Sequence, residues 1–222
     1  MNDDFILISI DVELSGPRIK KNGIVEIGAC AYSLKTKENV DTFSILINLP
    51  MEHEFDEKTL KEFWDNKENI GYERLQKVKK FIMERGGYDP KFTMNKFVNW
   101  LKNIFKQFAN SNINNIQIIV DTVSIECYWI NSYIEEYTKE LPLHLLFGSF
   151  KDVIDTHSFT LGLCRMSYED LSKENLSSED KFFRQKFGLK EVPSIKNDHC
   201  ALNDSIYIMQ EHLLQIKCFT NK

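Results

Sequence analysis

The sequence predicts an α/β fold with a mixed five-stranded sheet and helices on both faces. The first observation is a set of apolar, β-branched runs typical of strands, at Phe5–Val12, Ile24–Tyr32, Thr42–Ile47, Ile116–Val120 and Val153–Ile154. The second is that the first three runs follow one another closely, whereas the last two alternate with segments of helical periodicity. This order favours a mixed sheet that helices cover on both sides.

Apolar residues that recur every three or four positions identify the helical segments. From about Glu57 the apolar period changes from that of a strand to that of a helix, first at Leu60, Phe63 and Trp64. Two further helices are expected to contain Phe97, Leu101, Ile104, Phe105 and Phe108, and Tyr128, Trp129, Tyr133 and Ile134. The most linker-like stretch, Ser167–Asp180, is too short to separate two domains. We therefore expect one domain over residues 1–222.

Composition indicates a folded globular protein. The 222 residues are 42% hydrophobic and 27% charged, close to the averages for soluble domains. No apolar run approaches the roughly 18 residues needed to cross a bilayer. The N-terminus is acidic where a secretory signal would be basic. We therefore expect an intracellular, cytoplasmic protein with no membrane contact.

Cysteine usage and net charge narrow the chemistry further. The five cysteines are widely spaced and form no C-x-x-C pair, so we expect reduced thiols and no zinc site. The net charge of −5 argues against a protein that holds nucleic acid mainly by neutralising phosphates. A carboxylate-rich metal site would change that argument, because bound divalent cations can meet a phosphate even on an acidic protein.

The first candidate motif is Asp11-Val12-Glu13, at the end of the first predicted strand. Side chains two residues apart on a strand project from the same face, so the two carboxylates can hold a hard divalent cation together. An acidic strand end that faces water is the alternative. The motif alone does not decide between them.

A second candidate motif, from His199 to Asp204, lies near the C-terminus. Residues five apart on a continuous helix point about 140° away from each other, so both side chains serve one site only if His199 precedes the helix. Asn197 and Asp198 are suitable cap residues for that arrangement. A surface histidine and a solvated aspartate are the alternative.

A third carboxylate, Glu126, follows the predicted strand Ile116–Val120 and lies at the start of a helix. It would emerge from the next strand of the sheet. A structural explanation competes with a functional one, because Asp121 and Ser124 are good helix N-caps. Glu126 would then be a first-turn acid that the helix dipole favours.

Together, the three segments resemble the DEDDh exonucleases, the superfamily of polymerase proofreading subunits, ribonuclease T and oligoribonuclease. DVELSG at 11–16 matches the family's D-x-E motif, which a small or hydroxyl residue and glycine follow, and HCALND at 199–204 matches H-x-A-x-x-D. The second motif, usually N-x-x-x-D, is here Thr122 to Glu126 and differs at both named positions. Glutamate replaces this aspartate in some viral members.

Further segments carry the resemblance over most of the chain. IVEIGA at 24–29 and the pair Asp155-Thr156 are typical neighbours of the family's motifs. Thr59-Leu60 with Phe63-Trp64 is similar to the T-x-x-F-W segment of one bacterial exoribonuclease branch. The resemblance implies a ribonuclease H-like fold, which agrees with the order of predicted strands and helices.

The resemblance also implies a metal-dependent 3′-to-5′ exonuclease. Asp11, Glu13, Glu126 and Asp204 would bind two Mg²⁺ or Mn²⁺ ions, and His199 would be the general base. An unperturbed imidazole, with a pKa near 6.5, is largely neutral at physiological pH and can take a proton from the attacking water. The expected product is a nucleoside 5′-monophosphate.

The substrate implied by the resemblance is single-stranded RNA or DNA, or the 3′ end of a nucleic acid. Leu14, Ser15 and Gly16 would contact the terminal nucleotide, with Leu14 wedged against its base. An ordinary core residue at the end of a strand is the alternative for Leu14. A homodimer is left open, because several relatives are homodimers.

Two other functions remain open at the level of sequence. The altered second motif would fit a catalytically silent nucleic-acid-binding or interaction protein that kept the fold. Against that reading, all four carboxylates and the histidine are present. A Mg²⁺-dependent nucleotide pyrophosphatase would use the same metal ligands but act on free nucleotides.

Overall fold

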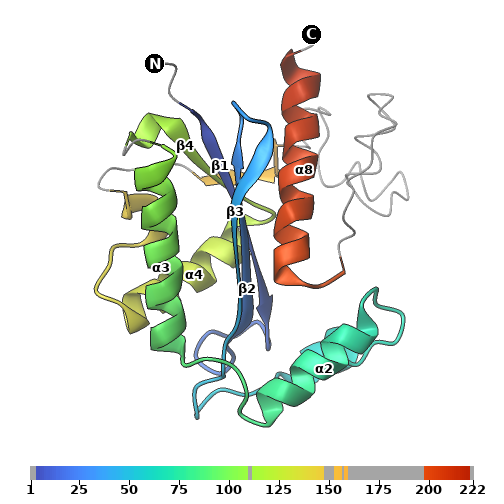
Figure 1. Ribbon diagram of the computed structural model, residues 1–222. Helices are drawn as coiled ribbons and strands as arrows, with labels where there is room; N and C mark the ends of the chain where they lie inside the picture. Colours follow the sequence, from blue (N-terminus) through green and yellow to red (C-terminus); the bar gives the residue numbers. More distant parts are fainter. Residues whose placement is uncertain (1–3, 110–111, 148–152, 157, 160–197, 221–222) are drawn as a thin grey trace.

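The computed structural model describes residues 4–109, 112–147, 153–156, 158–159 and 198–220. It contains a five-stranded sheet in the order β3-β2-β1-β4-β5 (Figure 1). The first three strands are antiparallel, and β4 and β5 run parallel to β1. The predicted mixed five-stranded sheet is therefore confirmed. The strands are β1 (Ile6–Leu14), β2 (Ile24–Ser33), β3 (Glu38–Leu46), β4 (Ile116–Val120) and β5 (Val153–Asp155).

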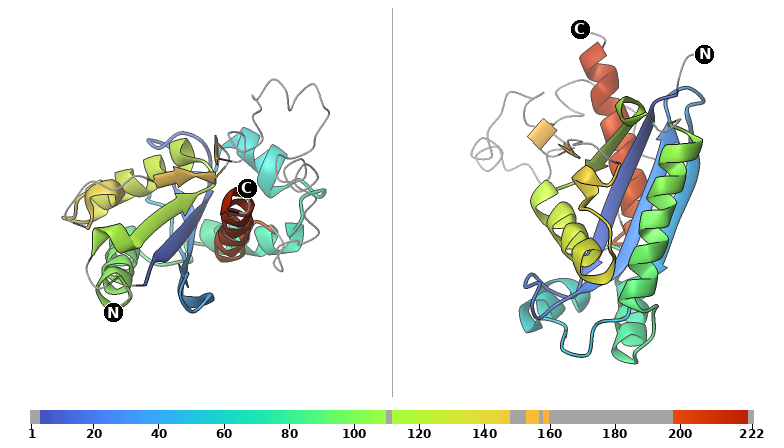
Figure 2. Two further views of the ribbon diagram at one scale, coloured as in Figure 1. Left: turned by 90° about the horizontal axis from the view of Figure 1, so that it is seen from above. Right: turned by 90° about the vertical axis from the view of Figure 1, so that its left-hand side faces the viewer.

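Helices lie on both faces of the sheet, as the sequence predicts. Helices α3 (Pro90–Gln107) and α4 (Val123–Tyr137) cover one face, and α8 (Ala201–Thr220) lies on the other (Figures 1 and 2). None of the described helices is long and apolar enough to cross a membrane. The predicted linker-like stretch 167–180 lies outside the described residues. The other helical elements in the described residues are α1 (Glu57–Thr59), η1 (Leu60–Trp64), α2 (Tyr72–Met83), η2 (Ile113–Asn115) and η3 (Leu143–Leu145).

Strand β1 is central in the sheet, and its side chains alternate between the two helical layers. Ile8 and Ile10 are fully buried in the core that α3 and α4 cover. Leu7 belongs to a separate apolar cluster with Met209 of α8. Because a strand repeats every two residues, the odd-numbered positions of β1 face α8. The same alternation places Asp11 and Glu13, which follow Ile10, on the face next to α8.

The segment from Glu57 to Trp64 differs from the continuous α-helix that its apolar spacing predicts. One turn of α-helix is followed by a π-helical turn, in which the N–H of Asp65 donates to the carbonyl of Leu60 at 2.7 Å. Trp64 is fully buried, and its indole N–H donates to the carbonyl of Leu14 at 3.1 Å. Phe63 stays partly exposed. The wider turn thus places Trp64 in the core and its neighbour Phe63 on the wall of a cavity.

Gly28 of β2 lies directly against the first turn of α8. A Cβ atom at this position would fall 1.9 Å from the carbonyl carbon of Ala201 and 2.1 Å from the backbone nitrogen of Leu202. Backbone atoms in a helix cannot move aside as the end of a flexible side chain can. The absence of a side chain at Gly28 therefore sets how closely α8 approaches the sheet.

We expect Gly28→Ala to lower the free energy of unfolding by about 1–3 kcal/mol, the usual cost of added volume in a packed core. Ser44→Ala is the matched control, because Ser44 pairs with Gly28 across β2 and β3 but is exposed. The control should change stability by less than about 0.5 kcal/mol. Urea unfolding measures both values. Equal stability of the two variants would contradict the close packing of α8 on β2.

Candidate functional site

Asp11 and Glu13 project from the second half of β1 towards α8. They are two residues apart on the central strand, so their side chains share one face of the sheet. Glu13 is only 6% exposed and Asp11 is half-buried. An acidic strand end facing water is therefore not what the structure contains at Glu13. The sheet instead holds two carboxylates inside the protein.

His199 precedes α8, and Asp204 lies in its first turn. His199 has a positive φ of 58°, a left-handed conformation that costs a non-glycine residue about 1–3 kcal/mol. Oδ1 of Asp204 accepts a hydrogen bond of 3.0 Å from the N–H of Asp198. The loop is thereby folded back over the start of the helix. His199 lies outside the helix, as its five-residue spacing from Asp204 predicts.

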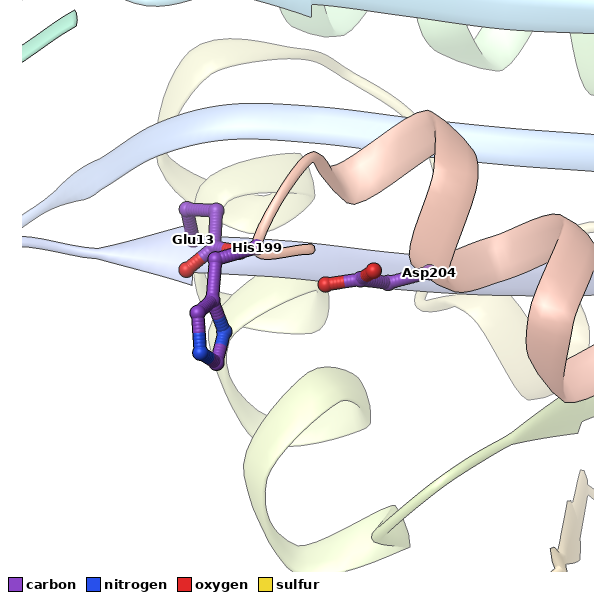
Figure 3. Close-up of side chains that lie close together, drawn as sticks. All are labelled: Glu13, His199 and Asp204. Carbon is purple, nitrogen blue, oxygen red and sulfur yellow. The ribbon is translucent and has the colours of Figure 1, made fainter. Parts of the chain in front are cut away.

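The loop before α8 and strand β1 bring Glu13, His199 and Asp204 together. One potential ligand atom from each of these side chains lies within 4.8 Å of the others. Figure 3 shows the three side chains converging from β1, the loop and α8. Asp11 shares these acidic surroundings, because burial raises its pKa most and the charges of Glu13, Asp204 and Glu126 raise it further. Residues from three distant parts of the sequence thus form one acidic site.

Glu126 lies in the first turn of α4 and is buried, with 6% of its surface exposed. Its Oε2 accepts a hydrogen bond of 3.0 Å from the N–H of Thr122. Thr122, rather than Asp121 or Ser124, is the N-cap of α4, and its side chain makes no capping hydrogen bond. Glu126 is therefore a buried first-turn acid whose side chain accepts a hydrogen bond from the N-cap residue, and neither Asp121 nor Ser124 is the N-cap.

The buried carboxylates hold protons more tightly than carboxylates in water do. Burial is the largest cause, and it raises the pKa of Glu126 to about 8 and that of Asp204 to about 7. Burial and neighbouring negative charges also raise the pKa values of Asp11 and Glu13. Repulsion of this kind is what a divalent cation relieves, and carboxylate oxygens are the ligands that Mg²⁺ and Mn²⁺ prefer. The donor set therefore fits such an ion.

His199 is held in its neutral form. Burial lowers the pKa of its imidazole, as does the nearby charge of Arg74, whereas the charge of Asp198 raises it. The ring contacts Phe63 edge to face, with 4.7 Å between the ring centroids. A neutral imidazole can accept a proton or bind a metal ion, and its distance from Glu13 and Asp204 suits either role.

A cavity of about 750 Å³ opens beside the carboxylates. Glu13 lines it, and so do apolar side chains from the end of β1, from η1 and from α4. A cavity with apolar walls and a few convergent polar groups is typical of a ligand-binding site. The residues that form its walls include Leu14, Gly16, Pro17, Phe63, Ile125 and Tyr128.

The three first-motif residues predicted to contact substrate differ in their placement. Leu14 and Gly16 line the cavity. Ser15 does not, because it is fully buried and its hydroxyl donates to the carbonyl of Glu54 at 3.0 Å and accepts from the N–H of Gly23 at 2.9 Å. Ser15 therefore holds the turn after β1 in place.

Several polar residues near the site were given no role from sequence. Glu26 of β2 lies opposite Glu13 on β1, and Glu26 forms an ion pair with the guanidinium of Arg74. Asp155, at the end of β5, accepts a hydrogen bond of 3.1 Å from the N–H of Val123 at the start of α4. An acid within the apolar run IVEIGA is a sequence signal for Glu26. We find no comparable signal for Arg74.

Solved structures with a similar fold include a nuclease and several exonucleases. They include cell-death related nuclease 4, with a TM-score of 0.61 and 11% identity over 96% of this chain and 64% of that one. A full-length 3′-exonuclease has a TM-score of 0.61 and 13% identity over 98% and 62% of the two chains. The nuclease domain of 3′hExo, a DEDDh family member bound to rAMP, has a TM-score of 0.57 and 14% identity over 98% and 95%.

These comparisons confirm the ribonuclease H-like fold that the resemblance implies. The chain spans slightly less than two thirds of the first two proteins, 64% and 62% of their lengths. No protein-family model matches the sequence, and no curated protein matches it significantly. The likeness to known proteins is therefore one of fold.

We expect the metal-free protein to lose stability as its buried carboxylates ionise. Because folding raises the pKa values of Glu126 and Asp204 to about 8 and about 7, the folded state holds protons that the unfolded state releases between about pH 4 and those values. Glu126→Gln and Asp204→Asn should therefore raise the melting temperature in EDTA at pH 8 and change it little at pH 4. A difference from wild type that does not grow with pH would contradict this account.

Proposed function

We propose that the protein is a metal-dependent 3′-to-5′ exonuclease that hydrolyses the terminal phosphodiester bond of RNA or DNA and releases a nucleoside 5′-monophosphate. The observation that carries the proposal is the convergence of Glu13, His199 and Asp204 beside a cavity with apolar walls. The fold, which solved 3′-exonucleases share, supports it. The proposed site residues all belong to one chain, and nothing in the structure tests the homodimer that the sequence left open.

Asp11, Glu13, Glu126 and Asp204 are the proposed ligands of two Mg²⁺ or Mn²⁺ ions. When bound, two such ions would stabilise both the attacking and the leaving oxygen of an in-line displacement. The carboxylates supply the negative charge that keeps the ions in place. The burial of Glu13, Glu126 and Asp204 supports this role, because charged groups in a poorly solvated site interact strongly with an ion.

His199 is the proposed general base. It would take a proton from water while the water oxygen forms a bond to phosphorus and the bond from phosphorus to the 3′ oxygen of the preceding nucleotide breaks. The lowered pKa of the imidazole supports this role, because the ring is neutral and ready to accept a proton at physiological pH.

The cavity is the proposed site of the terminal nucleotide. Leu14, Phe63 and Ile125 line it, so a base could pack against apolar side chains there. Its volume of about 750 Å³ is ample for a nucleotide. Gly16 keeps the turn at its edge compact, since a Cβ atom there would fall 2.5 Å from Cβ of Asp56.

A catalytically silent protein of the same fold is less well supported. The carboxylates of Asp11 and Glu126 have raised pKa values, so each opposes folding at neutral pH unless an ion or a proton compensates. A protein with no use for a metal ion would be more stable without these charges.

The function is tested by incubating the protein with Mn²⁺ and single-stranded RNA or DNA labelled at the 5′ end. Stepwise shortening from the 3′ end, with nucleoside 5′-monophosphate as the product, is the expected result. Nucleoside triphosphates in a parallel reaction test the pyrophosphatase alternative. Hydrolysis of the triphosphates without shortening of either strand would overturn the proposal.

Replacing the carboxylates should separate activity from folding. Glu13→Ala and Asp11→Ala are expected to abolish hydrolysis at saturating Mg²⁺, and Glu126→Gln should do the same, because each removes a charge that holds an ion. All three should stay folded by circular dichroism. An active Glu126→Gln variant would remove Glu126 from the proposed ligands.

His199→Ala should lower turnover by about 10²–10⁴-fold, the usual contribution of a general acid or base. Mn²⁺ affinity should change little, because the carboxylates remain. Turnover is measured by the release of mononucleotide, and affinity by titration calorimetry. Loss of Mn²⁺ binding in this variant would make His199 a metal ligand instead.

A further inference from the structure

The loop that carries His199 is held by residues far away in the sequence. The ring of Phe63, from η1, packs edge to face on the imidazole. Gly71, the N-cap of α2, lies so close to the loop that a Cβ atom there would fall 2.1 Å from the carbonyl oxygen of Asp198. Elements η1 and α2 therefore enclose the loop from the side opposite α8.

Arg74, in the first turn of α2, makes the polar contacts of this enclosure. Its Nη1 donates a hydrogen bond to the backbone carbonyl of His199. Its Nη2 donates to both carboxylate oxygens of Glu26, and the nitrogen lies 2.6 Å from Oε1. Glu26 in turn accepts a hydrogen bond from the backbone N–H of Ala201. Arg74 and Glu26 together thus connect β2 and α2 with the backbone on both sides of the His199 loop.

We propose that Arg74, held by Glu26, is a positioning residue for His199: it fixes the carbonyl of His199 and so keeps this residue in the left-handed conformation that directs its imidazole towards Glu13 and Asp204. This inference rests on the proposed function of the site. Arg74 is not one of the three converging residues, Glu13, His199 and Asp204, and it does not line the cavity. It would therefore act through His199.

The shape of the guanidinium matters for this role as well as its charge. The contacts to Glu26 and to the His199 carbonyl use different nitrogens of the fork. A lysine ammonium is a compact charge on a flexible stem and has no such fixed fork. A purely electrostatic role, in which the positive charge of Arg74 lowers the pKa of Glu13, would be retained by lysine.

A double-mutant cycle with His199→Ala tests the inference. Arg74→Gln should lower kcat by about 10- to 100-fold, the range for a misplaced catalytic group, with little change in KM. In the His199→Ala background the same substitution should have no further effect on kcat. An equal loss in both backgrounds would overturn the inference. Arg74→Lys should recover only part of the loss, and full recovery would assign Arg74 an electrostatic role instead.

Lys79→Gln is the matched control. Lys79 also lies on α2 and pairs with a carboxylate, that of Asp65, away from the loop. Its loss should leave kcat within about twofold of wild type, because a pair that touches no reacting group contributes little. A loss as large as that of Arg74→Gln would mean that any weakening of α2 slows the reaction.

A measurement that does not need activity keeps this inference separate from the proposed function. The ¹H–¹³C signals of the His199 imidazole, assigned by their absence in His199→Ala, should shift or broaden in Arg74→Gln and stay unchanged in Lys79→Gln. Unchanged signals in Arg74→Gln would overturn the inference even if the protein is a nuclease. Changed signals in a protein without nuclease activity would overturn the proposed function alone.

Discussion

The site depends on one electrostatic constraint, the burial of several carboxylates around the C-terminal end of the central strand β1. Glu13, Glu126 and Asp204 are each at most 6% exposed, and burial together with neighbouring negative charges raises the pKa values of their side chains. Folding brings these groups together at a cost in stability, which a divalent cation would offset. The apolar core around β1 therefore has to hold a site that opposes folding when the site is ionised.

Local geometry explains which parts of this arrangement could be predicted from the sequence. The alternation that buries Ile8 and Ile10 on one face of β1 places Asp11 and Glu13 on the other, so the same pattern predicts the strand and the carboxylate pair. The helical repeat likewise predicts that His199 precedes the helix that carries Asp204. Both predictions need only the geometry of one element.

Contacts between distant elements could not be predicted in this way. Arg74 is 125 residues from His199, and their hydrogen bond exists only because α2 packs beside the start of α8. The hydroxyl of Ser15 fits a substrate contact on motif grounds, but the fold directs it to the backbone of Glu54 and Gly23. The π-helical turn at Phe63 and Trp64 has the apolar spacing of an ordinary helix. A sequence pattern shows neither the partner of a polar group nor the turn that carries it.

The pairing of Glu13 with Glu26 shows how the fold gives two similar acids different roles. They lie directly opposite each other on β1 and β2, where like charges destabilise a sheet. Glu26 receives the guanidinium of Arg74, and the charge of Arg74 lowers the pKa of its carboxyl group against the effect of burial. Glu13 instead lies beside His199 and Asp204. One arginine therefore pairs with the acid that supports the loop, whereas burial and the nearby charges of Asp204 and Glu26 raise the pKa of the neighbouring acid, Glu13.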